Sequence, residues 1–288
     1  MIYGLVAALG WGFADFFAAM AGRRMGSIAT VVLGQTISAV FMTAVLLATG
    51  TEVAPLTTIA WVVVLNGFFT AVAYGAHYRA LELGPVAVVS PISAGYVVVG
   101  VALAIIVLGE RPDPIAFLGA AVVVAGAFLV STDLHAWREG IRERPPGLPW
   151  AIVSTIGFGV AGFMLAYGSK HVGWVLALWA SRVAQIVFYT PLFAARRHEV
   201  VRLRTATKVT VAFAVGAGVA DILGVTTYAA GAEAGYVSIV LAASAVFPLI
   251  AVALSIGMLH ERLVTNQWVG VAAVVLGLAL LGLGSVSG

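Results

Sequence analysis

The chain has 288 residues, of which 62% are hydrophobic and 9% are charged, and it carries a net charge of +3. A soluble domain is typically about 45–50% apolar and about 25% charged, so this composition leaves too few charges for a water-facing surface and predicts a protein embedded in lipid. The chain has no cysteine, which excludes disulfides and thiolate chemistry, and its basic residues lie in short loops rather than in the patch that nucleic-acid binding needs.

Ten apolar runs are each long enough to cross a bilayer as a helix, which takes roughly 20 residues. We expect helices and not barrel strands, because a barrel needs short segments of alternating polarity and this sequence has none. The first run lacks the charged segment and cleavage pattern of a signal peptide, so we expect it to remain as a span. In chain order, the expected spans are Ile2–Ala21, Ser27–Gly50, Thr58–Tyr78, Pro85–Gly109, Pro114–Thr132, Leu148–Ser169, Val172–Ala195, Val209–Gly231, Ala234–Leu259 and Val264–Gly284.

The connections between these spans are short, and we expect the second longest, over 196–208, to be a loop. The longest contains Pro145-Pro146, a natural boundary between two units. We therefore divide the chain into a first five-helix unit over 1–133, a connecting loop over 134–147 and a second five-helix unit over 148–288.

Basic residues are distributed unequally between the two sides of the predicted bundle. Loops after even-numbered spans hold only Arg111 and Lys170. Loops after odd-numbered spans hold twelve basic residues: Arg23, Arg24, Arg79, Arg138, Arg142, Arg144, Arg196, Arg197, Arg202, Arg204, Lys208 and Arg262. The positive-inside rule then places the odd-numbered loops in the cytoplasm and both termini outside.

The two units resemble each other at a fixed offset of 151 residues. The matching positions include Glu82 with Glu233, Gly84 with Gly235, Glu110-Arg111 with Glu261-Arg262, Gly119 with Gly270 and Gly126 with Gly277. Because each unit has an odd number of spans, the second must enter the membrane inverted. Inverted repeats are typical of secondary transporters, whose substrate site lies near the midplane between the repeats. The paired glycines predict close helix packing.

These motifs resemble the EamA module of the drug/metabolite transporter superfamily. The first copy runs from Tyr78-Arg79-Ala80-Leu81 through Leu108-Gly109-Glu110-Arg111 to Gly126, and the second from Tyr228-Ala229-Ala230 through Leu259-His260-Glu261-Arg262 to Gly277. The copies differ from that pattern in two places: Val97 stands where the second copy has Pro248, and His260 replaces the glycine of the turn. The resemblance implies a ten-helix membrane transporter, nearest to the bacterial exporters of aromatic amino acids.

Four ionisable residues fall inside the expected spans, where a charge costs at least ~2.5 kcal/mol at the bilayer centre. Asp221 and Arg182 both lie near mid-span, which predicts an ion pair, either structural or in contact with substrate. Asp15 lies one helical turn after Trp11; it either reaches water at the membrane boundary or forms a cation or proton site, since burial favours the protonated form of a carboxylate. The fourth is His77, which is a neutral hydrogen-bonding residue or a proton carrier.

Polar and aromatic residues at helical spacing predict the wall of a cavity around these groups. Tyr78 could instead belong to an interfacial aromatic belt. Pro91 and Pro248 each free a backbone carbonyl, which either accepts from a substrate ammonium group or marks a packing kink. The residues that we expect to contact the substrate are Trp11, Asp15, Asn66, Tyr74, His77, Tyr78, Ser90, Ser93, Arg182, Asp221, Tyr228 and Ser244.

Three smaller expectations concern the surroundings of this site. Gln35 and Gln185 should join helices by polar contacts. Glu110 and Glu261 should cap helices or pair with the adjacent arginines at the span ends. No catalytic residue, metal site or cofactor is expected, since the sequence has neither a two-histidine zinc motif nor a phosphate-binding glycine loop.

Secondary transport of small metabolites by alternating access is therefore the favoured function, with amino-acid export across the bacterial inner membrane as its most specific form. Proton-coupled export of lipophilic organic cations is the alternative, because aromatic rings and one uncompensated carboxylate would suit such a substrate. An intramembrane enzyme is the hypothesis from another class. We expect membrane lipid, the substrate and protons as partners, and a monomer.

Overall fold

The computed structural model describes residues 1–84, 86–111, 113–131, 147–195, 197–250, 253–254 and 265–286, and the regular structure within these ranges is helical throughout. In chain order the elements are α1 (Ile2–Met25), α2 (Ser27–Thr49), the 3-10 helix η1 (Ala54–Ile59), α3 (Ala60–Leu83), α4 (Val86–Ala94), α5 (Tyr96–Leu108), α6 (Pro114–Ser131), α8 (Leu148–Val172), α9 (Trp174–Ala195), α10 (Arg197–Arg204), α11 (Lys208–Ala234), α12 (Val237–Ser244) and α14 (Thr265–Val286).

Five of the described segments are long and apolar enough to cross a membrane: Ile2–Met25, Ser27–Thr49, Ala54–Leu83, Leu148–Val172 and Lys208–Ala234. Shorter apolar helices accompany them at Ile92–Leu108, Pro114–Gly126, Val237–Ile250 and Trp268–Gly277. The expectation of an all-helical, multi-pass membrane protein is thereby confirmed, and the count of ten spans stays a prediction.

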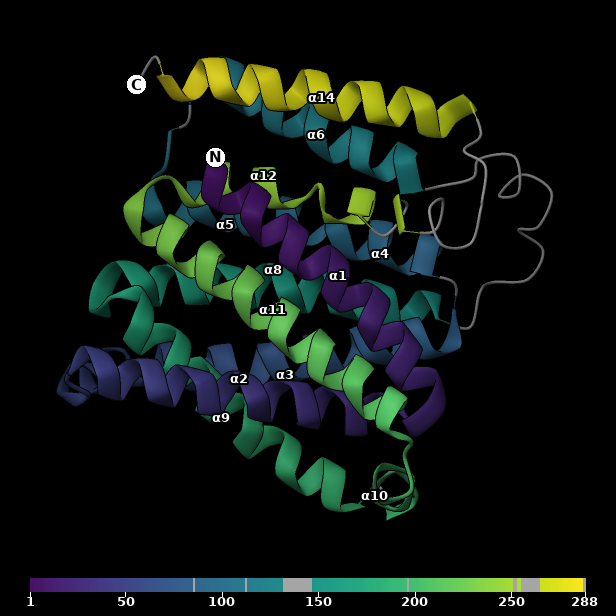
Figure 1. Ribbon diagram of the computed structural model, residues 1–288. Helices are drawn as coiled ribbons and strands as arrows, with labels where there is room; N and C mark the ends of the chain where they lie inside the picture. Colours follow the sequence, from purple (N-terminus) through teal and green to yellow (C-terminus); the bar gives the residue numbers. More distant parts are fainter. Residues whose placement is uncertain are drawn as a thin grey trace.

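The helices run roughly side by side and form a layered bundle (Figure 1). α6 and α14 make an outer layer on one side, and α2 and α9 lie on the opposite side. Between them lie α1, α3, α8 and α11 together with the short helices α4, α5 and α12, with α1 packed against α11 and α3 against α8. The start of α1 and the end of α14 lie at the same end of the bundle (Figure 1), and α10 lies toward the other.

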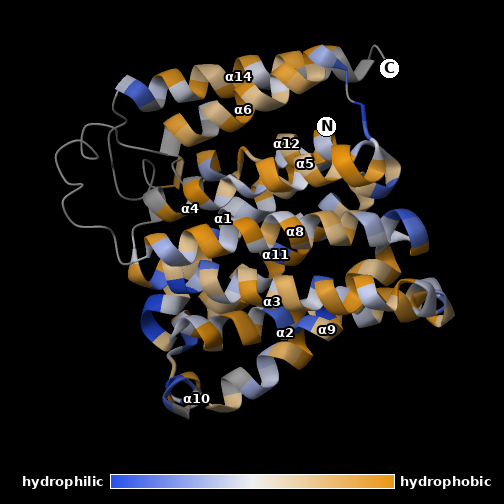
Figure 2. Ribbon diagram, turned by 180° about the vertical axis from the view of Figure 1, so that it is seen from behind, coloured by the Kyte–Doolittle hydropathy of each residue, from blue (hydrophilic) through white to orange (hydrophobic). Residues whose placement is uncertain are grey.

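Most of the helical ribbon carries hydrophobic residues, and many of the hydrophilic ones lie near the helix ends (Figure 2). Leu47 and Ile106, for example, expose 75% and 78% of their surface. Large apolar side chains exposed to this extent are costly in water and favourable in hydrocarbon, so this surface fits a lipid environment.

Glycine permits close contact between α6 and α14. A Cβ at Gly126 would come within 2.7 Å of the Val274 amide nitrogen, and a Cβ at Gly277 within 2.7 Å of the Val123 amide nitrogen. Each backbone therefore occupies the space that the other's side chain would fill. The expectation that these glycines serve close packing is confirmed.

The expected fourth span is broken rather than continuous. α4 ends at Ala94 and α5 begins at Tyr96, with a turn at Gly95, although the proline of this segment lies four residues earlier. Thr155 lies on α8, and its hydroxyl donates to the Ile92 carbonyl at 2.7 Å. This carbonyl therefore has a hydrogen-bond partner although the helix is interrupted. The expected ninth span is likewise interrupted, by a turn at 245–246 after α12, and its end lies outside the described residues.

The expectation of a simple loop over 196–208 was wrong, because this connection contains α10, whose RHEVVRLR sequence has a polar and an apolar side. Of the two roles left open for Glu110, the structure shows the cap. Its carboxylate accepts from the amides of Val237 and Ser238 at 2.8 and 3.0 Å and so caps the start of α12. The connecting loop over 134–147 lies almost wholly outside the described residues, as do Leu259, His260, Glu261 and Arg262.

Candidate functional site

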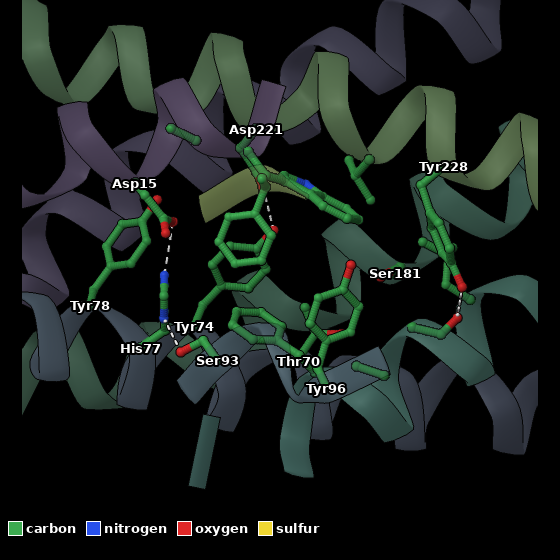
Figure 3. A pocket seen from close by; sticks show the side chains of 18 of the residues that line it. Asp15, Thr70, Tyr74, His77, Tyr78, Ser93, Tyr96, Ser181, Asp221 and Tyr228 are labelled. Atoms are coloured by element: carbon green, nitrogen blue, oxygen red, sulfur yellow. Dashed lines mark hydrogen bonds and ion pairs between the residues drawn. The ribbon is translucent and has the colours of Figure 1, made fainter. Parts of the chain in front are cut away.

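A cavity of about 90 Å³ lies at the centre of the bundle, between α1, α3, α4, α5, α8, α9 and α11 (Figure 3). Ten of the twelve residues expected to contact substrate line it: Trp11, Asp15, Asn66, Tyr74, His77, Tyr78, Ser93, Arg182, Asp221 and Tyr228. The residues come from both halves of the sequence, and the tertiary fold therefore brings the predicted set to one place.

Asp221 and Arg182 form the buried ion pair that their mid-span positions predict. The Arg182 Nη2 lies 3.5 Å from the Asp221 Oδ2, and each side chain is only 2% exposed. The Tyr74 hydroxyl donates to the other carboxylate oxygen (Figure 3), and the guanidinium also lies 5.6 Å from the Tyr74 ring centroid. A permanent positive charge thus compensates this carboxylate, as a buried charge requires.

Two glutamine side chains extend this network to α2 and along α9, as polar contacts between helices. Arg182 Nη1 donates to Gln35 Oε1 at 2.5 Å and to Gln185 Oε1 at 3.0 Å, and the Gln35 amide donates to Asp221 at 3.3 Å. Within the described part of the chain, the Arg182 Nε–H has no hydrogen-bond partner. One donor of this guanidinium is therefore buried without a partner among the described residues.

Asp15 does not reach water at the membrane boundary. It is 6% exposed, its Oδ1 lies 2.9 Å from His77 Nε2, and its Oδ2 accepts from the Ser90 hydroxyl at 2.7 Å. His77 Nδ1 lies 3.0 Å from Ser93 Oγ, so side chains on α1, α3 and α4 form one connected group (Figure 3). The sequence predicted both ionisable residues in the site but not that they pair.

Aromatic rings line the opposite side of the cavity. The Trp11 and Tyr96 rings are 6.1 Å apart at 85°, and the Trp11 and Tyr228 rings are 5.8 Å apart at 44°. The Tyr228 hydroxyl donates to the Gly162 carbonyl at 2.8 Å, which fixes that ring. This cluster offers flat apolar contact with an edge-to-face geometry that aromatic groups prefer.

Two predicted residues lie behind the wall rather than on it. Ser90 holds Asp15, and Ser244 lies 2.6 Å from the Tyr96 hydroxyl. Both serines are buried, so each orients a wall residue.

Several wall residues were absent from the predicted set. Thr70 shares the polar stripe of α3 and could have been included on that signal. Tyr96, Phe158 and Phe247 stand in apolar segments, where nothing in the sequence separates a cavity-lining ring from a packed one. Ser181, next to Arg182, has a buried hydroxyl at the wall.

Each carboxylate of the cavity wall lies next to a basic side chain. Two carboxylates line the cavity among the described residues, one next to an arginine and one next to a histidine. The same part of the chain contains no cluster of three metal-ligating side chains. The arrangement can hold a small polar molecule by complementary charges while a ring contacts its apolar part.

Comparison with known proteins identifies the family. The model of the EamA-like transporter family matches residues 1–132 and 145–283, which is nearly the whole chain. A solved structure, described as a crystal structure of a protein, superposes with a TM-score of 0.74 at 18% sequence identity and covers 98% of this chain and 96% of that chain, which shows a shared fold. No curated protein matches the chain.

Proposed function

We propose that this chain, which belongs to the EamA-like transporter family, is a secondary transporter that exports small zwitterionic metabolites, foremost aromatic and neutral amino acids, across the bacterial inner membrane. Membership of that family supports a membrane transporter of small molecules. The amino-acid class and the direction are the proposal.

The observation that carries this proposal is the pairing of each carboxylate of the buried wall with a basic side chain. A zwitterion brings one positive and one negative group and adds no net charge to a low-dielectric cavity. Asp15 offers a carboxylate oxygen for the ammonium group, and the unpartnered Arg182 Nε–H offers a donor for the carboxylate. The rings of Trp11, Tyr96 and Tyr228 supply contact for an aromatic side chain.

Export of lipophilic cations is less well supported. Such a substrate has no carboxylate to place beside Arg182, whereas a zwitterion has one.

We further propose ten spans arranged as two inverted repeats that alternate access to the cavity. In support, a shift of 151 residues makes α1 correspond to α8 and α3 to α11, so the contact of α1 with α11 corresponds to the contact of α8 with α3. The contacts of Gly126 and Gly277 are reciprocal in the same way. Two similar units in opposite orientation give outward-open and inward-open states of similar energy. The protein acts as a monomer in this proposal, since one chain contains the whole cavity.

Counterflow into proteoliposomes tests the function. Vesicles preloaded with unlabelled phenylalanine should take up labelled phenylalanine, and external tyrosine or tryptophan should compete, whereas protein-free vesicles should show no exchange. Uptake of tetraphenylphosphonium without any amino-acid exchange would instead favour the cation alternative. Absence of flux for both would contradict the proposal.

A further inference from the structure

A chain of hydrogen bonds leads from the cavity into α8 through four side chains. Asp15 Oδ1 lies 2.9 Å from His77 Nε2, His77 Nδ1 lies 3.0 Å from Ser93 Oγ, and Ser93 Oγ lies 3.0 Å from Ser154 Oγ. Ser154 then donates to the Ala151 carbonyl at 2.8 Å. All four side chains are buried, so water does not replace these bonds.

Hydrogen bonds at the far end of this chain suggest its direction. Ser154 lies within hydrogen-bond distance of the Ala151 carbonyl, which only accepts and which also accepts from the Thr155 hydroxyl at 2.8 Å. With the Ser154 proton on that carbonyl, Ser154 accepts from Ser93 and Ser93 accepts from His77. In this arrangement His77 Nδ1 carries a proton.

One more proton must lie on the other side of the imidazole. His77 Nε2 and Asp15 Oδ1 are both acceptors without it, and their 2.9 Å separation is a hydrogen-bond distance. Ser90 already donates to the second oxygen of Asp15. The Asp15–His77 pair thus holds one proton between its two facing atoms and is neutral as a unit.

The two carboxylate pairs of the cavity wall, Asp221–Arg182 and Asp15–His77, differ in whether a proton can leave them. The partner of Asp221 is a guanidinium, which does not give up its proton in proteins. The partner of Asp15 is an imidazole, the side chain suited to gaining and losing a proton near neutral pH. Of the two carboxylates, only Asp15 has a partner that can become uncharged.

We propose that the Asp15–His77 pair is the coupling site of the transporter, where the substrate ammonium group and one proton replace each other. This inference rests on the proposed function. When the ammonium group reaches Asp15, the proton leaves His77 Nε2 for cavity water, the imidazole keeps its Nδ1–H on Ser93, and Asp15 stays a carboxylate. One positive charge enters as one leaves, so the Asp15–His77 pair together with its bound ammonium group stays neutral. Proton entry from outside then drives substrate export.

The other titratable and charged groups around the pair do not take over this role. Tyr74 and Tyr78 of α3 and Tyr96 of α5 line the same cavity. Their side chains are neutral phenols near pH 7. Asp221 of α11 and Arg182 of α9 neutralise each other. The described parts of α4, α8 and α12 next to the pair contribute serine hydroxyls and apolar groups.

Calorimetry in buffers of different ionisation enthalpy counts the protons released per ligand bound and tests this exchange. Phenylalanine binding to the purified full chain at pH 7 should release one proton, and so should phenethylamine, which has the ammonium group alone. 3-Phenylpropionate, which lacks the ammonium group, should release none. His77→Gln should bind phenylalanine without proton release, and Glu52→Gln, an exposed carboxylate on the surface, should behave as the wild type.

The outcomes separate this inference from the proposed function. Phenylalanine binding without proton release in the wild type would overturn the coupling site and leave amino-acid transport standing. Binding of phenethylamine with release, but no binding of phenylalanine, would support the coupling site and contradict the amino-acid class. Undiminished release in His77→Gln, or no release with either amine, would overturn the inference. Thermal unfolding of His77→Gln checks that the variant is folded.

Discussion

Arg182 is a fully buried cation whose charge is compensated by groups on three other helices. Asp221 lies on α11, Gln35 on α2 and Tyr74 on α3, and they meet at one guanidinium. A buried charge is tolerated only where such partners replace water, and removing one partner costs far more than the pair itself contributes. At the scale of single residues, the site is therefore sensitive to any change that alters one charge alone.

Asp221→Asn should lower both stability and transport, because it leaves the Arg182 charge buried without compensation. Breaking such a pair costs about 3–5 kcal/mol. The change is measured as the midpoint of thermal unfolding and the initial rate of phenylalanine counterflow. The exposed Glu52→Gln serves as the control. Adding Arg182→Gln to Asp221→Asn should recover part of the stability, and a double variant no more stable than the single one would contradict the pairing.

Trp11→Ala should weaken substrate binding, because the indole forms part of the aromatic side of the cavity. An aromatic contact contributes ~0.5–1.5 kcal/mol beyond the area it buries, which predicts a Kd raised roughly two- to tenfold. Trp61→Ala is the matched control, since Trp61 is 57% exposed and outside the cavity. Equal affinities in the two variants would remove the aromatic wall from the binding site.

Helix packing in this bundle depends on glycine where two backbones approach each other closely. The α6–α14 contact uses this device twice, once from each helix. In lipid, such contacts stabilise helix association by van der Waals packing, because burial of apolar surface supplies no driving force there. At the scale of elements, small residues therefore decide which helices can lie side by side.

Gly126→Ala should destabilise the protein, because the added methyl group would lie 2.7 Å from the Val274 amide nitrogen and 2.9 Å from the Gly270 carbonyl oxygen. Overpacking of this kind typically costs about 1–3 kcal/mol. Gly22→Ala is the matched control within α1, where an added methyl group would meet nothing within 4 Å and a gain of up to ~1 kcal/mol in helix propensity is expected. Thermal unfolding in detergent distinguishes them; a tolerated Gly126→Ala would show that α6 and α14 separate readily.

Glu110→Ala should loosen the start of α12. It removes the acceptor for the Val237 and Ser238 amides and leaves these buried donors unpaired, at a cost of ~1–3 kcal/mol. Hydrogen exchange at the first amides of α12 measures the effect. Asp113→Ala, which removes an exposed cap of the α6 amide at Ile115, should leave exchange in α12 unchanged. Equal exchange in both variants would argue against a cap from Glu110.

The whole molecule has two chemically different ends. One holds the start of α1 and the end of α14, and the other holds α10 (Figure 1), whose sequence includes Arg197, Arg202 and Arg204. The positive-inside rule assigns the basic end to the cytoplasm. Because the natural chain has no cysteine, single introduced thiols report this orientation without background.

Glu52→Cys should react with a membrane-impermeant maleimide from the outside of intact cells, and Thr205→Cys should react only in inverted vesicles. Both positions are exposed, one at each end of the bundle. Labelling is read on the purified protein by mass. The reverse pattern would place the termini in the cytoplasm, and labelling of each site from both sides would indicate mixed orientation.

The sequence by itself determined that lipid surrounds the protein, that its fold is all-helical and which residues form most of the cavity wall. Lipid excludes charge and unpaired backbone groups, so apolar runs and the few residues that violate them, such as Asp15 and Arg182, can be recognised without a structure. Helical spacing also placed Asn66, Tyr74 and His77 on one stripe. These are local properties of the chain, and the described helices agree with them.

Only the tertiary structure decided which residues pair with each other. That Asp15 faces His77, that Glu110 caps a helix of the other half and that α4 breaks at Gly95 next to Thr155 depend on contacts between segments far apart in the sequence. Helical periodicity says which face of a helix a residue occupies, but not which helix that face meets. The position of the proton in the Asp15–His77 pair likewise depends on the tertiary structure, because it follows from hydrogen bonds between residues on different helices.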